Sequence, residues 1–205
     1  MAIPIFLLAA GLSQRFGEAD KRLAELRPGC SMLAAMQRRA ARAGLDVNTI
    51  LRDTDRHLVL GETSIGRCWY ATCAHQGMGS SLAEGLAQWL AAQGAGGNMP
   101  LPDALLVMPA DLPLLRVSTV AAVSQAAASD CIVRPRCAGK TGHPVAFGRQ
   151  FWPELLALEG EFGARALIQA NAERLNDVDV QDEGIYLDAD TPEQFEQLRA
   201  RLQHF

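Results

Sequence analysis

The sequence lacks the features that mark several large classes of protein. Its five cysteines form no C-x-x-C pair and have irregular spacing, which indicates reduced thiols rather than a disulfide framework or a zinc site. No apolar stretch approaches the ~20 residues that cross a bilayer. The apolar N-terminal run has neither a basic flank nor a small-residue cleavage site. We therefore expect a cytoplasmic protein that has no membrane partner.

An excess of basic residues is also absent. The formal net charge of −4 argues against nucleic-acid binding, although a local group of cations can still hold a small anion. The chain has no G-x-S-x-G, which argues against a serine hydrolase, and no G-x-x-x-x-G-K-[ST], which argues against a P-loop ATPase. No repeat or linker divides the 205 residues, so we expect a single domain over residues 1–205.

Apolar segments of strand and helix character alternate along the whole chain. Expected strands cover Ile3–Ala10, Val47–Leu51, Arg67–Thr72, Ala104–Met108, Cys131–Arg134, His143–Phe147 and Leu175–Val180. Expected helices cover Ser31–Ala43, Thr54–Leu60, Gly77–Ala92, Val117–Ala128, Phe151–Leu158, Gly163–Ala170 and Pro192–Leu202, with loops at Gly94–Pro102 and Arg136–Gly142. This alternation predicts an α/β fold, a three-layer αβα sandwich around a mostly parallel sheet.

The first candidate site is the loop after the N-terminal strand. Gly11 breaks the apolar run, and a polar turn with Ser13, Arg15 and Gly17 leads to Lys21. Glycines let backbone N–H groups approach phosphate oxygens, and the two cations would neutralise them. In open α/β sheets, ligands bind beyond the carboxyl ends of the strands, which is where this loop would lie. The alternative is an ordinary surface loop.

Two carboxylates are candidate ligands for Mg²⁺, a hard cation that bridges protein carboxylates to substrate phosphates. Asp111 follows the apolar segment Ala104–Met108 and stands between two prolines. Asp190 precedes Thr191 and Pro192, a good helix start. For both residues, helix capping is the alternative role.

The segment GMGSSL, which starts at Gly77, is close to the dinucleotide fingerprint G-x-G-x-x-G. Leu82 replaces the third glycine, and no acidic residue ends a second strand about twenty residues later. The segment could instead surround the base and ribose of a nucleotide, or Ser80 or Ser81 could simply cap the following helix.

The order of these motifs is itself informative. LAAG-x-S-x-R-F-G with K-x-L-A-x-L, then GMGSSL, D-x-P, GHP and DTPE resemble the MobA-like nucleotidyltransferases. LAAG and GMGSS are most similar to the molybdopterin cytidylyltransferase branch, whereas the guanylyl branch usually has LAGG. The resemblance implies a Rossmann-like sheet of the nucleotide-diphospho-sugar transferase type, with one strand reversed near the end.

The resemblance also implies an Mg²⁺-dependent transfer of a nucleotide, with CTP favoured, to the terminal phosphate of molybdopterin. It implies a molybdenum hydroxylase apoenzyme as a further partner. Its implied catalytic residues are Arg15, Lys21 and Asp111, and its metal ligands are Asp111 and Asp190. Its implied nucleotide-binding residues are Leu8, Ala9, Ala10, Gly11, Ser13, Arg15, Lys21, Gly77, Met78, Gly79, Ser80 and Ser81. His143 and Lys140 would bind the acceptor, although a lone histidine and a loop lysine are more often structural.

Four alternatives stay open at this point. They are a molybdopterin guanylyltransferase, another nucleotidyltransferase acting on a sugar or alcohol phosphate, an NAD(P)-dependent oxidoreductase, and a non-catalytic molybdenum cofactor chaperone.

Overall fold

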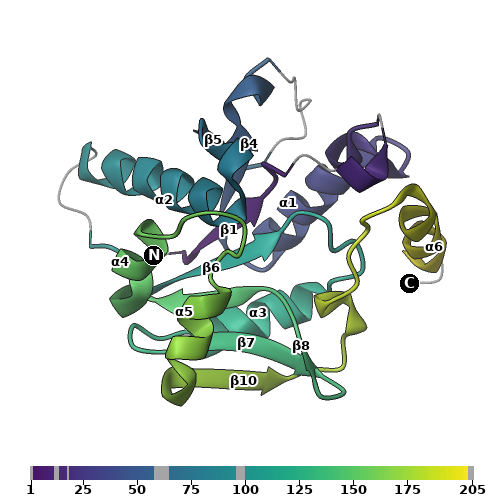
Figure 1. Cartoon of the computed structure of the whole chain (residues 1–205). Helices are drawn as coiled ribbons and strands as arrows, with labels where there is room; N and C mark the ends of the chain where they lie inside the picture. The colour runs from purple at the N-terminus through teal and green to yellow at the C-terminus, as the bar shows by residue number, and fades with distance from the viewer. Residues whose placement is uncertain (1, 12–13, 18, 58–64, 96–99, 203–205) are drawn as a thin grey trace.

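The computed structural model describes residues 2–11, 14–17, 19–57, 65–95 and 100–202. Its centre is an eight-stranded sheet with the order β10-β7-β9-β6-β1-β4-β5, in which β8 pairs with β7 (Figure 1). The strands are β1 (Pro4–Leu8), β4 (Asp46–Arg52), β5 (Arg67–Ala71), β6 (Ala104–Pro109), β7 (Ile132–Cys137), β8 (Lys140–Thr141), β9 (Val145–Gly148) and β10 (Leu175–Asp179).

Most neighbouring strands of this sheet are parallel. β1 pairs in parallel with β4 and β6, β4 with β5, and β7 with β10. β9 is antiparallel to both of its neighbours, β6 and β7. The expected α/β class and the reversed strand near the end are therefore confirmed.

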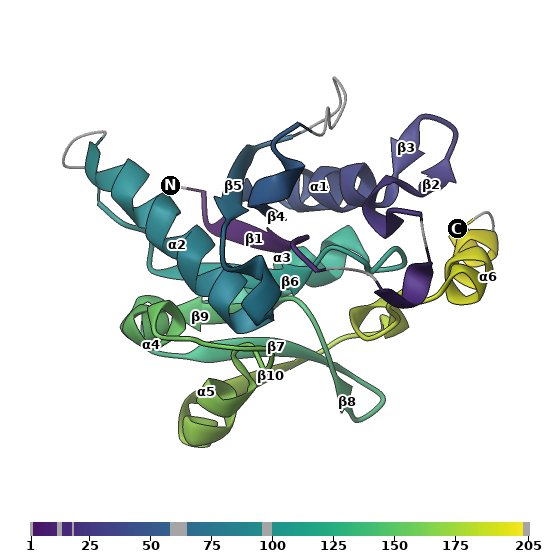
Figure 2. The ribbon, with the colours of Figure 1, turned by 45° about the horizontal axis from the view of Figure 1, so that its top comes forward.

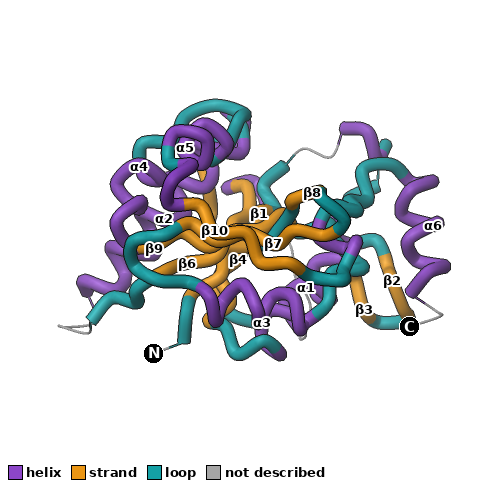
Figure 3. The backbone as a smooth tube through the Cα atoms, turned by 90° about the horizontal axis from the view of Figure 1, so that it is seen from below, coloured by secondary structure: helices purple, strands orange, loops and turns teal. Residues whose placement is uncertain are grey.

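Helices cover both faces of the sheet, as Figure 3 shows from below: α1 and α3 lie on one side, and α2, α4 and α5 on the other. They are α1 (Met32–Arg42), α2 (Met78–Ala95), α3 (Val117–Ala126), α4 (Trp152–Leu156), α5 (Arg165–Ala170) and, beyond the edge of these layers, α6 (Pro192–Leu202). No helix in the described part of the chain is long and apolar enough to cross a bilayer.

Strand β1 is buried on both faces, which explains its unbroken apolar run. Ile5 and Leu7 belong to the cluster under α1 and α3, whereas Phe6 belongs to the cluster under α2 and α4. Phe6 and Trp89 make an edge-to-face contact with ring centroids 5.7 Å apart. Each such fully buried side chain contributes about 1.5–3 kcal/mol to stability. The central strand therefore gives the loop that follows it a rigid base.

A third apolar cluster joins the C-terminal helix to the N-terminal part of the chain (Figure 2). Phe16 of the first loop contacts Phe195 of α6 edge to face, with centroids 5.8 Å apart. Leu26, Met32 and Ala189 are buried in the same cluster. Leu26 lies in a small hairpin, β2 (Glu25–Arg27) with β3 (Cys30–Ser31), which the sequence patterns did not indicate. This packing brings the end of the chain beside the first loop.

One expected loop is partly strand. Arg136–Gly142 was expected to be irregular, but β7 continues to Cys137 and turns back into β8. The two residues at the turn, Ala138 and Gly139, have φ values of 48° and 80°. Two-residue hairpins favour this left-handed backbone, which propensity reasoning does not expect of an alanine. The loop expectation was therefore wrong.

Two helix expectations also differ from the structure. The helix expected over Thr54–Leu60 is a 3-10 turn at Asp53–Asp55, and residues 58–60 lie outside the described ones. Helix α2 ends at Ala95, three residues later than expected.

Candidate functional site

Four of the predicted residues meet at one point. The Nζ of Lys21 lies 2.7 Å from the Asp111 carboxylate and 3.2 Å from the Asp190 carboxylate. Arg15 Nη1 lies 2.9 Å from the other oxygen of Asp190. The Lys21 side chain is 11% exposed, whereas that of Arg15 is 78% exposed. The site thus has a largely buried cation, Lys21, at its base and a solvent-exposed cation, Arg15, at its rim.

Asp111 reaches this point from the carboxyl end of the central strand β6. Its backbone carbonyl accepts a hydrogen bond of 3.1 Å from the N–H of Ala189, which ties the two carboxylate segments together. Asp111 does not cap the next helix, α3, whose N-cap is Arg116. Asp182 holds that end instead, because it accepts from the Arg116 N–H and the Thr119 hydroxyl.

The cap of α6 likewise belongs to residues other than Asp190. The Thr191 hydroxyl accepts from the Gln194 N–H, and the Gln194 side chain accepts from the Thr191 N–H, a reciprocal capping box. The Gln194 oxygen also accepts from the Asp190 N–H at 2.9 Å. The carboxylate of Asp190 is thereby left to the two cations.

The electrostatics of this cluster favour cation binding. Burial by itself lowers the pKa of Lys21, but Asp111 and Asp190 outweigh it and raise that pKa, so Lys21 stays charged. Burial, together with the charges of Asp190 and Asp111, raises the pKa of Asp188. Three interacting carboxylates, Asp111, Asp188 and Asp190, therefore outnumber the two paired cations, Lys21 and Arg15.

A pocket of about 460 Å³ opens beside this cluster, at the carboxyl ends of β1, β4 and β6. It is lined by eleven of the predicted residues: Leu8, Ala9, Ala10, Gly11, Arg15, Lys21, Gly77, Met78, Ser81, Asp111 and Asp190. Seven further lining residues were not predicted: Arg22, Ile50, Ala74, His75, Pro109, Ala110 and Glu161. Ser13, also predicted to bind nucleotide, lies outside the described residues.

The GMGSS segment forms one wall of the pocket and the start of α2. Gly77 has φ 121°, and a Cβ there would lie 2.6 Å from the backbone of Gly160 and Glu161. Gly79 and Ser80 face the same loop rather than the pocket: the Gly79 N–H donates to the Gly160 carbonyl, and the Ser80 hydroxyl accepts from the Gly160 N–H. Both serines lie inside the first turn, so neither is the N-cap. Gly77 and Gly79 thus allow close contact with the loop at Gly160. The two glycines are visible in the sequence, but the loop that they contact is not.

The two predicted acceptor residues lie apart from the pocket lining. His143 is half-buried, and its Nδ1 has no hydrogen-bond partner among the described residues. Burial lowers its pKa despite the opposing charge of Asp111, so the imidazole is neutral. Lys140 is exposed on β8, with its Nζ 5.3 Å from the centre of the Tyr186 ring.

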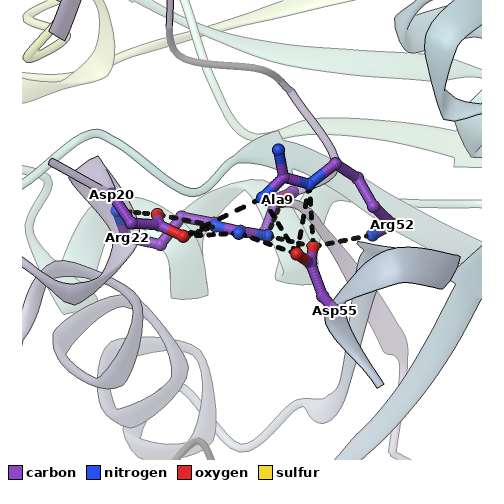
Figure 4. Close-up of polar contacts among 5 residues, drawn as sticks. All are labelled: Ala9, Asp20, Arg22, Arg52 and Asp55. Carbon is purple, nitrogen blue, oxygen red and sulfur yellow. Dashed lines mark hydrogen bonds and ion pairs between the residues drawn. The ribbon is translucent and has the colours of Figure 1, made fainter. Parts of the chain in front are cut away.

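A buried network beside the pocket was missed by sequence reasoning. Arg22 contacts the carboxylates of Asp20 and Asp55 and the carbonyl of Ala9, and Arg52 also contacts Asp55 (Figure 4). Burial alone would raise the pKa of Asp55, but the two arginines hold it far below its usual range. In the sequence, Arg22 is simply a second basic residue beside Lys21. Only the fold shows that its partners are Asp20, Asp55 and the Ala9 carbonyl.

The carboxylates fit a divalent cation that arrives with phosphates. Asp111 Oδ1 is buried and has no hydrogen-bond partner within the described residues, so an acceptor is left over at this point. In the described part of the chain, no group of three or more His, Cys, Asp or Glu side chains is arranged to hold a metal ion. Mg²⁺ commonly uses one or two carboxylates and takes its other ligands from phosphates and water. Asp111 and Asp190 match that smaller set.

The mostly parallel sheet with one reversed strand is a fold found in nucleotidyltransferases. The sequence pattern of the MobA-like NTP transferase domain matches residues 5–177, and the chain belongs to that family. No curated protein sequence matches the chain significantly.

Solved structures share the fold over nearly the whole chain. Rv0371c of Mycobacterium tuberculosis, in a complex with manganese, has a TM-score of 0.74 at 22% identity and covers 98% of this chain and 99% of its own. A nucleotidyl transferase from Methanothermobacter, Mth528, has a TM-score of 0.78 at 16% identity, with 99% and 98% covered. CMP:2-keto-3-deoxy-manno-octonic acid synthetase, complexed with CTP, has a TM-score of 0.72 at 15% identity, with 100% and 99% covered.

Proposed function

We propose that this protein is a Mg²⁺-dependent cytidylyltransferase that transfers CMP from CTP to the terminal phosphate of molybdopterin. The observation that carries the proposal is the convergence of Lys21, Arg15, Asp111 and Asp190 at one end of the pocket. An oxygen of the acceptor phosphate attacks the α-phosphorus of CTP, the bond to the β-phosphate oxygen breaks, and pyrophosphate leaves. Catalysis of this step depends mainly on positioning and charge neutralisation.

The residues divide this work between them. Lys21 and Arg15 would bind triphosphate oxygens, exchanging carboxylate for phosphate partners, and would stabilise the departing pyrophosphate. Asp111 and Asp190 would hold Mg²⁺, which when bound neutralises phosphate charge. His143, neutral and close to Asp111, and Lys140 would meet the acceptor from the side of β8 and β9.

The base preference rests on the pocket wall. From these two segments, Ala9, Ala10, Gly11, Gly77 and Ser81 offer backbone groups and small side chains to a base, and Leu8 and Met78 add larger apolar ones. Such a wall would accept a pyrimidine and discriminate against a purine by shape and by polar groups that a purine leaves unpaired. These segments also carry the similarity to the cytidylyl branch, which supports CTP over GTP.

The test is pyrophosphate release by the purified protein with Mg²⁺, molybdopterin and either CTP or GTP. We expect kcat/KM to be at least tenfold higher with CTP, because two binding modes that differ by a few kcal/mol differ by that factor or more. A clear preference for GTP would place the protein in the guanylyl branch. Pyrophosphate release only with another phosphorylated acceptor would refute molybdopterin as the substrate.

A further inference from the structure

Lys21 and Arg22 are adjacent basic residues in the same 3-10 turn, yet they contact different segments of the chain. Lys21 contacts Asp111 and Asp190 beyond β6, whereas Arg22 points toward the end of β4. The Arg22 side chain is 6% exposed, and that of its partner Asp55 is 4% exposed. A buried arginine at the wall of an anion pocket invites the interpretation of a phosphate ligand.

The donor count of Arg22 contradicts that interpretation. Nε donates to Asp20 at 2.8 Å. Nη1 donates to the Ala9 carbonyl at 2.9 Å and to Asp55. Nη2 donates to Asp20 and, at 3.1 Å, to Asp55. A guanidinium has five N–H donors, so every one of them already has an acceptor in the protein.

The partners of Arg22 belong to three different segments of the chain (Figure 4). Ala9 follows β1 and lines the pocket. Asp20 is the N-cap of the turn that carries Lys21, and it accepts from the Arg22 N–H. Asp55 follows β4 and is itself fixed by Arg52, whose backbone N–H and side chain both donate to it.

We propose that Arg22 is a positioning residue, which locks the turn of Lys21 and the Ala9 wall to β4 so that Lys21 faces the triphosphate. This inference rests on the proposed function of Lys21. Two carboxylates on adjacent edges of a planar guanidinium, Asp20 at Nε and Nη2 and Asp55 at Nη1 and Nη2, fix both its place and its orientation. Once the side chain of Arg22 is fixed, the backbone of the turn has little freedom. This sets the direction in which the side chain of Lys21 projects from the turn, toward Asp111 and Asp190.

The experiment is a double-mutant cycle between Arg22→Lys and Lys21→Ala, followed by pyrophosphate release. Arg22→Lys keeps the charge but carries three donors on one nitrogen instead of five in a planar fork, so it cannot make both two-point carboxylate contacts together with the Ala9 contact. We expect at least a tenfold loss of kcat in the otherwise wild-type protein, and less than a twofold further loss in the Lys21→Ala background. A residue that acts through Lys21 must lose its effect when Lys21 is absent.

Two more variants keep the test sharp. Arg52→Lys alters another arginine on the same carboxylate of Asp55. Among the described residues, Arg52 donates to Asp55 and lies 3.9 Å from Asp20, and it has no hydrogen bond to Ala9 or Lys21. We expect it to lower the melting temperature with less than a threefold loss of kcat. If Arg22→Lys does not fold, Asp55→Asn replaces it, because it weakens the same Arg22–Asp55 contacts, and its loss of kcat should depend on Lys21 in the same way. An equal loss of kcat from Arg22→Lys, or from Asp55→Asn, with Lys21 present and with Lys21→Ala would overturn the inference.

The cycle is repeated on nucleotide affinity, measured by calorimetry with CTP, GTP and ATP in the presence of Mg²⁺. This second readout does not involve the acceptor. If molybdopterin yields no pyrophosphate but a nucleotide binds, the proposed acceptor fails while the coupling of Arg22 to Lys21 is still measured. We expect Arg22→Lys to weaken nucleotide binding at least fivefold when Lys21 is present and to leave it unchanged when Lys21 is replaced by alanine. Unchanged nucleotide affinity of the Arg22→Lys single variant would overturn the inference.

Discussion

Asp111→Asn separates a metal role from a structural one. Asn keeps the size of the side chain and one acceptor oxygen but loses the charge. Lys21, 2.7 Å from Asp111, retains Asp190 at 3.2 Å, and the change relieves repulsion among carboxylates that raises the pKa of Asp188. We therefore expect stability to change by no more than about 1 kcal/mol, a shift of about 2–4 °C in melting temperature for a chain of this size.

Activity should respond very differently to the same change. Loss of one charged group at the transferred phosphate typically costs about 10²–10³ in rate, and a hundredfold loss corresponds to about 2.7 kcal/mol of transition-state stabilisation. The assay is pyrophosphate release with CTP over a range of Mg²⁺ concentrations. High Mg²⁺ should restore part of the rate, because the ion can still arrive with the triphosphate.

The matched control is Asp182→Asn, the same chemical change at a carboxylate that holds the start of α3 and caps the 3-10 turn at Glu183–Ile185. It should lower the melting temperature and leave kcat unchanged. Asp190→Asn, measured beside it, asks whether the second carboxylate shares the ion. Wild-type activity of Asp111→Asn at low Mg²⁺ would refute the metal role and the mechanism built on it.

Four further outcomes follow from single sites. Lys21→Ala should lower kcat at least tenfold with the fold intact by circular dichroism, since it removes a cation from developing charge; unchanged pyrophosphate release would contradict this. Gly77→Ala should raise KM for the nucleotide, because its Cβ would lie 2.6 Å from the backbone of Gly160; an unchanged KM would mean that the two loops separate freely. Burial raises the pKa of Glu84, but hydrogen bonds from Cys73 and its neighbour outweigh this and lower it to about 2. Because the pKa of Glu84 is lower in the folded than in the unfolded protein, its contribution to the free energy of unfolding is complete above about pH 4.5 and is lost as the pH falls toward 2. In Glu84→Gln, the free energy of unfolding measured with urea should therefore depend less on pH between about 4.5 and 2, and an unchanged pH dependence would refute the assignment. Burial and the Glu84 carboxylate raise the pKa of the Cys73 thiol to about 11; alkylation followed by mass spectrometry at pH 8 should therefore modify Cys73 more slowly in the folded protein than in urea.

The sequence by itself determined the architecture and the position of the first loop. An apolar run as continuous as Ile3–Ala10 suits only a strand buried on both faces, and the structure buries Phe6 on one face and Leu7 on the other. The hydrophobic period of a helix or strand is a local property, so seven strands and most helices were found within a few residues of their bounds. The turn at Ala138 and the hairpin around Leu26 were missed because they depend on contacts rather than on period.

The tertiary structure decided which charged residues meet. Lys21 is 90 residues from Asp111 and 169 from Asp190, and the sequence left helix capping open as the alternative role of each carboxylate. The start of α3 is held by Asp182, which is 66 residues from Arg116 and which no local pattern indicates. The cap of α6 is the local T-x-x-Q pattern of Thr191 and Gln194. The apolar contact of α6 with the first loop is what brings Asp190 to its cations.

The adjacent residues Lys21 and Arg22 show the same limit at its smallest scale. Both are basic and both follow a glycine-containing loop, so residue type and position in the sequence do not tell their roles apart. Neighbours in a 3-10 turn project about a third of a turn apart, and their roles depend on what lies in each direction. Arg22 meets the buried carboxylate of Asp55 and the partly exposed one of Asp20 and is fully paired, whereas Lys21 meets carboxylates at an open pocket. The direction of a side chain relative to distant segments is a property of the fold, because the free energy of a buried charge depends on partners that only the folded chain supplies.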